Sequence, residues 1–355
     1  MLKKINAILF SIALVFIQCS ENNNILNTAS SHDLSNSTWE TIDNPESVGW
    51  STAKLQDAYE YSQGIQTAAV MVIYQGKVLY HWGEIARKFN MHSCRKSLLS
   101  ALIGIHVDEG NIDIKATMKE LEIDDLPPSL SEQEKAATVR MLLQSRSGIY
   151  HPAAYETSSM KANRPARESH APGTFWYYNN WDFNTLCTIF EQRTQTKIFE
   201  EFKRRIADPI GMEDFEVNDA AYVYENASMH PAYPFRMTAC DMARFGLLFL
   251  GNGMWEGKRI ISEEWVREST TSYTEVGSSG GYGYMWWVAV NGNHIPSTNL
   301  GNSAFSARGF GGHFIVVIPD LDLVVVHRVN TDILNRVSSS QFGALLGLIL
   351  DAKVN

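Results

Sequence analysis

The sequence has few cysteines, no metal-binding pattern and no excess of basic residues, and each of these absences excludes a class of protein. Four cysteines in 355 residues are too few for a disulfide scaffold. The ten histidines form no His-x-His or His-Glu-x-x-His pattern, and no cysteine pair has zinc spacing, so we expect neither a metal nor another cofactor. The net charge is −9, and nucleic-acid binding needs a cluster of basic residues, so we expect no nucleic-acid partner.

Long hydrophobic runs are also scarce, and the run at the N-terminus is too short to span a bilayer. Residues 5–17 are apolar apart from Asn6 and Ser11, and they follow the cationic pair Lys3-Lys4. A short basic segment before an apolar segment of this length is typical of a secretory signal peptide. We therefore expect residues 1–18 to be a signal peptide and the protein to be exported to the periplasm or the cell surface.

Cys19 follows the apolar segment directly and begins a polar run. Its position resembles the lipobox of bacterial lipoproteins, in which the cysteine is acylated, although Phe16-Ile17-Gln18 departs from the small residues that this pattern prefers. We expect Cys19 to be lipidated and to anchor the protein to a membrane; cleavage of an ordinary signal peptide nearby is the alternative. Residues 19–38 are rich in Asn and Ser and are expected to form a flexible tether, with residues 39–355 as the folded domain.

Periodic patterns in the folded domain predict strands at both chain ends and helices between them. A helix that is apolar on nearly every side, expected at 93–107, is typical of a buried position. Residues 108–226 contain short helical stretches and proline-containing loops, which predict a helical subdomain. The simplest arrangement is an α/β (α+β) fold in which the terminal strands share one antiparallel sheet flanked by helices, with the helical domain beside it. Helices are expected at 52–62, 93–107, 241–250, 262–268 and 331–351, and strands at 69–74, 78–82, 282–290, 314–318 and 323–329.

The pattern with the most chemical meaning is Ser93-Cys94-Arg95-Lys96, at the start of the expected buried helix. At this spacing the side chains of Ser93 and Lys96 share a helix face, with their Cβ atoms about 5–6 Å apart. Burial of Lys96 would lower the pKa of its amine, as a general base requires, and backbone N–H groups at a helix N-terminus can stabilise an oxyanion. The alternative is that Ser93 caps the helix and Lys96 is a solvated charge.

Two further segments could complete such a site. In Pro172-Gly173-Thr174-Phe175-Trp176-Tyr177-Tyr178-Asn179, side chains two apart in an extended loop point the same way, so Tyr177 and Asn179 could present a hydroxyl and an amide to one cleft. Tyr178-Asn179-Asn180 has the same spacing, but the preceding Pro-Gly turn favours the first pair; a core aromatic cluster is the alternative. In Ala307-Arg308-Gly309-Phe310-Gly311-Gly312-His313, glycines next to a strand would let a ligand approach the backbone, and a bulge or tight bend is the alternative.

Taken in order, these three segments resemble the serine β-lactamase and penicillin-binding-protein superfamily, specifically its class C-like branch of esterases, amidases and peptidases. The resemblance covers nearly the whole chain after the tether and implies a β-lactamase/transpeptidase-like fold. Ser93-Cys94-Arg95-Lys96-Ser97 resembles the family's Ser-x-x-Lys-Ser, and residues 172–179 resemble its Pro-Gly…Tyr-x-Asn. Further segments that resemble the family's hallmarks are 138–148, 209–212, 241–246 and 282–287.

The resemblance also implies a role for each of these residues. Ser93 would form an acyl-enzyme, and Lys96 would take the proton of its hydroxyl. Tyr177 would pass a proton to the leaving group, and Asn179 would contact the substrate. The N–H of Ser93 would bind the oxyanion together with an N–H near Gly309 or Phe310.

The glycine-rich segment departs from the family pattern. True β-lactamases of this branch carry Lys-Thr-Gly there, whereas Ser306-Ala307-Arg308 occupies those positions in this chain. The missing Lys helps to bind the carboxylate of β-lactams and of peptide C-termini, although Arg308 is nearby. We therefore expect a serine hydrolase that acts on a small ester or amide. The alternatives are a β-lactamase or D-amino-acid peptidase acting on cell-wall peptides, and a non-catalytic lipoprotein that binds them.

Overall fold

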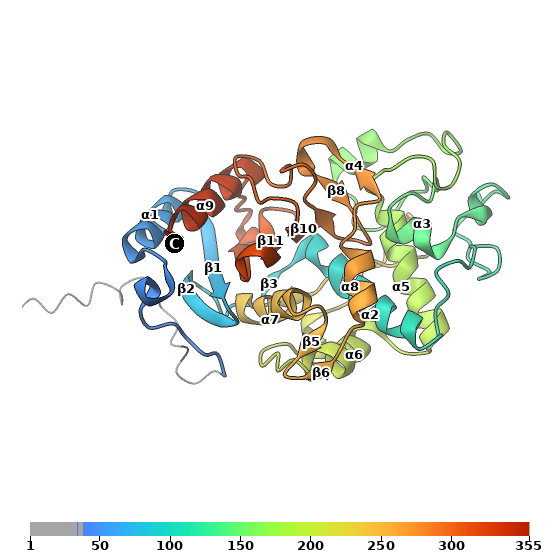
Figure 1. The fold of residues 1–355 in the computed structure, drawn as a ribbon. Coiled ribbons are helices and arrows are strands. Elements are labelled where there is room, and N and C mark those ends of the chain that lie inside the picture. The colour runs from blue at the N-terminus through green and yellow to red at the C-terminus, as the bar shows by residue number, and fades with distance from the viewer. Residues whose placement is uncertain (1–33, 35–37, 355) are drawn as a thin grey trace, which may run out of the picture.

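The computed structural model describes residue 34 and residues 38–354, with a sheet toward one end of the molecule and helices toward the other (Figure 1). Cys19 lies outside the described residues, as do the expected signal peptide and nearly all of the tether. Lipidation and export therefore stay predictions from the sequence. Within the described part, no helix is both long and apolar enough to cross a membrane.

An eight-stranded antiparallel sheet joins both ends of the chain, in the order β2-β1-β12-β11-β10-β9-β8-β7. The first hairpin pairs through β1 with β12, and in this register Val72 lies opposite Val325. All residues of β11 and β12 are buried, as is typical of strands covered on both faces. A sheet built from both chain ends is therefore confirmed. Its strands are β1 (Thr67–Tyr74), β2 (Lys77–Gly83), β7 (Thr274–Glu275), β8 (Gly281–Tyr282), β9 (Trp287–Val288), β10 (Phe305–Gly309), β11 (His313–Ile318) and β12 (Leu323–Val329).

Helices cover both faces of this sheet. On one face α1 (Thr52–Gln63) packs against α9 (Ser339–Asp351), and on the other α7 (Ala239–Leu250) packs on β11 and β12. Alternate residues of β12 divide between the two cores, with Val324 in the core that includes α7 and Val325 in the core under α1 and α9. A Cβ atom at Gly246 would lie only 2.6 Å from Val324 Cγ1, so a glycine is needed for α7 to lie this close to the sheet.

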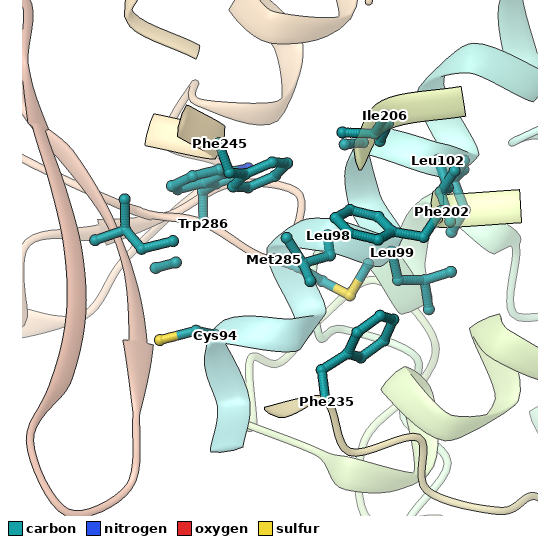
Figure 2. Packing of buried hydrophobic residues seen from close by; sticks show 14 of the residues in the cluster. Cys94, Leu98, Leu99, Leu102, Phe202, Ile206, Phe235, Phe245, Met285 and Trp286 are labelled. Carbon is teal, nitrogen blue, oxygen red and sulfur yellow. The ribbon is translucent and has the colours of Figure 1, made fainter. Parts of the chain in front are cut away.

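The buried helix expected from the sequence is α2 (Arg95–Asp108), which follows a 3₁₀ turn over His92–Cys94. Every residue from Arg95 to His106 is buried. Because its neighbours are close-packed on all sides, α2 is a rigid base for the residues at its N-terminus. Figure 2 shows part of this packing, in which side chains of α2 lie among residues from three other segments, including Leu98, Leu99, Leu102, Phe202, Phe235 and Met285.

Helices and loops fill the region between α2 and α7. Two short strands that pair with each other, β3 (Phe89–Asn90) and β4 (Arg236–Met237), lie at the borders of this region. A small hairpin and another helix then precede the C-terminal strands. The elements are α3 (Val139–Leu143), α4 (Ser158–Asn163), α5 (Asn180–Thr194) and α6 (Ile198–Phe202), then β5 (Met254–Trp255), β6 (Lys258–Arg259) and α8 (Glu263–Ser269).

Two expected elements were wrong in extent. The strand expected at 282–290 is divided into β8 and β9, since Met285 has a φ of 60° and donates its N–H to the carbonyl of Leu143 at 3.1 Å. The helix expected at 331–351 begins only at Ser339, because the N–H of Val337 bonds to the carbonyl of Gly311 at 3.0 Å. Both departures come from partners distant in sequence, which local periodicity does not encode.

Candidate active site

Ser93 lies in the turn that leads into α2 and is partly exposed. Just before it, His92 has a φ of 48°, and its N–H donates to Asn90 Oδ1 at 2.9 Å. A left-handed conformation is uncommon for a residue other than glycine, and such residues cluster at functional sites. The neighbouring Cys94 is fully buried, and burial raises the pKa of its thiol to about 12, so this cysteine is a poor nucleophile.

Lys96 brings its amine to Ser93, as the spacing predicts. Lys96 Nζ lies 3.0 Å from Ser93 Oγ, 2.8 Å from the hydroxyl of Tyr178 and 3.0 Å from Asn180 Oδ1. Only 2% of Lys96 is exposed, and its amine also lies 4.4 Å from the centre of the Phe183 ring. Burial lowers the pKa of Lys96 well below its usual value, and the charge of the adjacent Arg95 lowers it further. The alternative of a solvated lysine does not hold.

The tyrosine beside Lys96 is Tyr178, so the placement of Tyr177 in the site is corrected. The Tyr177 hydroxyl points elsewhere and donates to the carbonyl of Met160 at 2.9 Å. Neighbouring side chains of an extended segment point to opposite sides, so only one of these two tyrosines can reach Lys96. The backbone N–H of Tyr177 donates to the carbonyl of Ser145 and its carbonyl accepts from the Ser145 hydroxyl, which fixes the register of the segment.

The same shift of one residue applies to the asparagine, because Asn179 is the N-cap of α5. Its side chain accepts from the N–H of Trp181 at 3.2 Å and donates to Asp182 Oδ1 at 2.9 Å. Asn180 is the residue that reaches Lys96, and its amide nitrogen donates to the carbonyl of Tyr155 at 2.8 Å. An Asn followed three residues later by an Asp is a helix-start signal, and it could have assigned Asn179 to the cap.

Strand β10 brings Gly309 against the turn that carries Ser93. A Cβ atom at Gly309 would lie 2.4 Å from the carbonyl oxygen of Met91 and 3.3 Å from Cys94 Sγ. Glycine is therefore required for this close approach of the strand to the turn. Phe310 follows with 45% of its surface exposed, and its ring contacts His92 edge-on at 5.6 Å between ring centres. Both residues expected near the oxyanion thus lie beside the Ser93 turn.

The Arg308 side chain is held by hydrogen bonds to nearby residues. Its Nε donates to Ser306 Oγ at 2.9 Å, and one terminal nitrogen donates to the carbonyl of His294 at 2.8 Å. The guanidinium lies 4.7 Å from the ring centre of Trp287, whose indole stacks on Tyr178 at 5.7 Å. Burial lowers the pKa of Arg308 to about 9. Arg308 therefore supports the aromatic wall behind Tyr178, and Ser306 is its hydrogen-bond partner.

Groups that could bind a metal are dispersed in this fold. Among residue 34 and residues 38–354, no three His, Cys, Asp or Glu side chains are grouped so that they could hold a metal ion. The cysteines in this range, Cys94, Cys187 and Cys240, are buried free thiols. The polar groups around Lys96 are the hydroxyls of Ser93 and Tyr178 and the amide of Asn180.

Known structures share this fold. A proposed 6-aminohexanoate-dimer hydrolase from Bacillus anthracis matches with a TM-score of 0.62 and 22% identity, over 82% of this chain and 80% of its own. A family VIII carboxylesterase matches with a TM-score of 0.62 and 17% identity, over 85% of this chain and 96% of its own. The octameric penicillin-binding protein homologue from Pyrococcus abyssi matches with a TM-score of 0.61 and 18% identity, over 85% of this chain and 78% of its own.

The family follows from the sequence match. No curated protein matches this chain. The sequence profile of the beta-lactamase family matches residues 52–345, which include the whole sheet and every residue described above around Ser93. The expected fold and family are thereby confirmed: the chain belongs to the beta-lactamase family, a superfamily of serine hydrolases.

Proposed function

We propose that this protein is a serine hydrolase in which Ser93 attacks a small ester or amide and becomes acylated. The observation that carries the proposal is the position of Lys96 Nζ, 3.0 Å from Ser93 Oγ and 2.8 Å from the Tyr178 hydroxyl. A nucleophile and a base within hydrogen-bond distance, with the base held by a third group, is the arrangement that activates a serine. The buried Lys96 supplies that base because its lowered pKa favours the neutral amine.

The steps follow from these positions. Lys96 takes the proton of Ser93 Oγ as this oxygen bonds to the carbonyl carbon of the substrate. Tyr178 then gives its proton to the leaving group and recovers one from Lys96, the role that the sequence had suggested for Tyr177. Burial raises the pKa of Tyr178 to about 12, so its hydroxyl carries a proton at neutral pH. Water then releases the acyl group through the same residues in reverse.

Two backbone N–H groups are proposed to bind the oxyanion. One is that of Ser93, in the 3₁₀ turn that leads into α2, and the other is that of Phe310, which follows Gly309 at the end of β10. Support comes from the close approach at Gly309, where even a Cβ atom would meet the carbonyl of Met91 at 2.4 Å. Donors fixed in advance around a developing negative charge are usually the largest contribution to catalysis of this kind.

The substrate is proposed to be an ester or amide without an essential carboxylate. No cation replaces the family's Lys at Ser306, and Arg308 is engaged by His294 and Ser306. A lost charge-assisted hydrogen bond costs roughly 1.5–3 kcal/mol, or about ten- to a hundredfold in binding. The carboxylesterase and the proposed amide hydrolase among the similar structures agree with this substrate class.

A substrate panel tests the proposal. Short-chain p-nitrophenyl esters, a chromogenic cephalosporin and D-amino-acid peptides are assayed on the protein without its N-terminal segment. We expect kcat/KM for the best ester to exceed that for the cephalosporin by at least about tenfold, because the site has no Lys at position 306 to bind the carboxylate of the cephalosporin. Ser93→Ala should abolish ester hydrolysis. The control is Ser279→Ala, which should retain it: Ser279 lies in Gly277-Ser278-Ser279-Gly280-Gly281, a match to the Gly-x-Ser-x-Gly pattern of other serine hydrolases that leads into strand β8 rather than into the helix that this pattern requires. A preference for the cephalosporin that disappears only in Arg308→Ala would show instead a β-lactamase with a relocated cation.

We also propose that the protein is exported and anchored through a lipid on Cys19. The support is the sequence alone: a cationic start, an apolar segment of signal-peptide length and a cysteine directly after it. Metabolic labelling with a palmitate analogue should tag the wild type and spare Cys19→Ala. An unlabelled wild-type protein that is released in soluble form would leave ordinary secretion in its place.

A further inference from the structure

Arg95 is a buried cation directly beside Lys96. Only 1% of it is exposed, and its guanidinium lies over the rings of Tyr155 and Tyr233, at 5.4 and 4.8 Å from their centres. One terminal nitrogen donates to the carbonyl of His92 at 3.2 Å. The catalytic steps proposed above do not use this residue.

Within residue 34 and residues 38–354, no carboxylate forms an ion pair with this guanidinium. The nitrogens Nε and Nη2 of Arg95 are buried and have no hydrogen-bond partner among the described residues, and Nη1 bonds to a carbonyl. A buried charge without a counter-ion is costly. The ionisable groups on which its charge acts include His92, Cys94, Lys96, Tyr178, Cys187 and Tyr233, and none of these is a carboxylic acid. Two carboxylates near the Tyr155 ring have other partners: Glu225 accepts from the N–H of Tyr155, and Glu156 pairs with Arg164.

We propose that Arg95 is a positioning residue that acts through Lys96: its uncompensated positive charge favours the neutral amine that can accept the proton of Ser93. This inference rests on the proposed function. A second positive charge on Lys96 would be repelled by Arg95, and the groups in contact with Lys96 offer no negative charge, since Ser93, Tyr178 and Asn180 are neutral at pH 7. The buried charge of Arg95 is unfavourable for folding, but it keeps Lys96 in the form that the reaction needs. In agreement, Arg95 is the largest cause, after burial, of the lowered pKa of Lys96.

The pH dependence of kcat/KM for an ester tests this proposal, because its rising limb reports the ionisation of the base in the free enzyme. Arg95→Gln keeps a planar N–H donor for the carbonyl of His92 and removes the charge, and Arg95→Met keeps the volume. Both variants should move the rising limb to higher pH by about one unit, the order expected for a nearby charge in a protein. On the acidic side of the limb this shift equals an approximately tenfold loss of kcat/KM.

A purely structural role of Arg95 gives a different result. Loss of packing would lower kcat/KM by the same factor at every pH and leave the limb in place, and that result in a folded Arg95→Gln or Arg95→Met would overturn the proposal. If neither variant folds, Tyr155→Glu leaves Arg95 in place and adds a carboxylate against it, with Tyr155→Gln as the uncharged control. Only the Glu variant should shift the limb upward, and an unmoved limb would again overturn the proposal. A Ser93→Ala protein with full activity would instead contradict the proposed function, whatever the Arg95 variants do.

Discussion

Two segments meet at Lys96, residues 93–96 and residues 178–180, and the side-chain contacts of the first could be predicted from residue spacing whereas those of the second could not. Ser93 and Lys96 lie on one turn of chain at the start of the buried α2, and their contact is the one that the spacing predicts. Tyr178 lies in a loop and Asn180 is the first residue of α5, and this segment reaches the site from another part of the molecule. Here the spacing pointed to the residues one position earlier. A helix fixes which side chains share a face, whereas the side-chain directions of a loop depend on its hydrogen bonds to residues distant in sequence.

Removal of the base is expected to have the largest effect. Lys96→Ala should lower kcat/KM for an ester by about a thousandfold or more, since general acid–base groups contribute 10²–10⁴-fold. The measurement is steady-state ester hydrolysis beside thermal unfolding. Because Lys96 is buried without a negative partner, its loss should not destabilise the fold strongly. A variant with nearly normal kcat/KM would show that α2 does not supply the base.

The two tyrosines give the sharpest contrast between neighbouring positions. Tyr178→Phe removes the hydroxyl that lies 2.8 Å from Lys96 Nζ and should lower kcat/KM by about a hundredfold. Tyr177→Phe removes only the bond to the carbonyl of Met160, so kcat/KM should fall by less than about threefold, in line with one lost hydrogen bond at the edge of the site. A reversal of these two effects would restore the register first inferred from the sequence.

The two asparagines are expected to separate activity from stability. Asn180→Ala removes a hydrogen bond to Lys96 and should lower kcat/KM about tenfold, as for one such bond. Asn179→Ala removes the N-cap of α5 and should lower the free energy of unfolding by about 1–2 kcal/mol. Chemical denaturation and ester hydrolysis of both variants check this pair. Equal losses of activity in both variants would contradict the assignment.

The sheet and the buried helix could be predicted because their patterns are local. The β-branched runs of β11 and β12 and the apolar residues around α2 carry their own periodicity, and a short turn joins each pair of terminal strands. The break at Met285 and the late start of α9 at Ser339 could not be predicted, because each depends on one backbone bond to a distant carbonyl. The register at Tyr177 has the same origin, since the distant Ser145 fixes it from both its carbonyl and its hydroxyl.

Identification of the acylated residue tests the central claim most directly. The protein is treated with a fluorophosphonate, digested, and the modified peptide is sequenced by mass spectrometry. We expect a single adduct on Ser93 that is absent from Ser93→Ala and strongly slowed in Lys96→Ala. An adduct on Ser279 or Cys94 in the wild type, or labelling that persists in Ser93→Ala, would contradict the site described here.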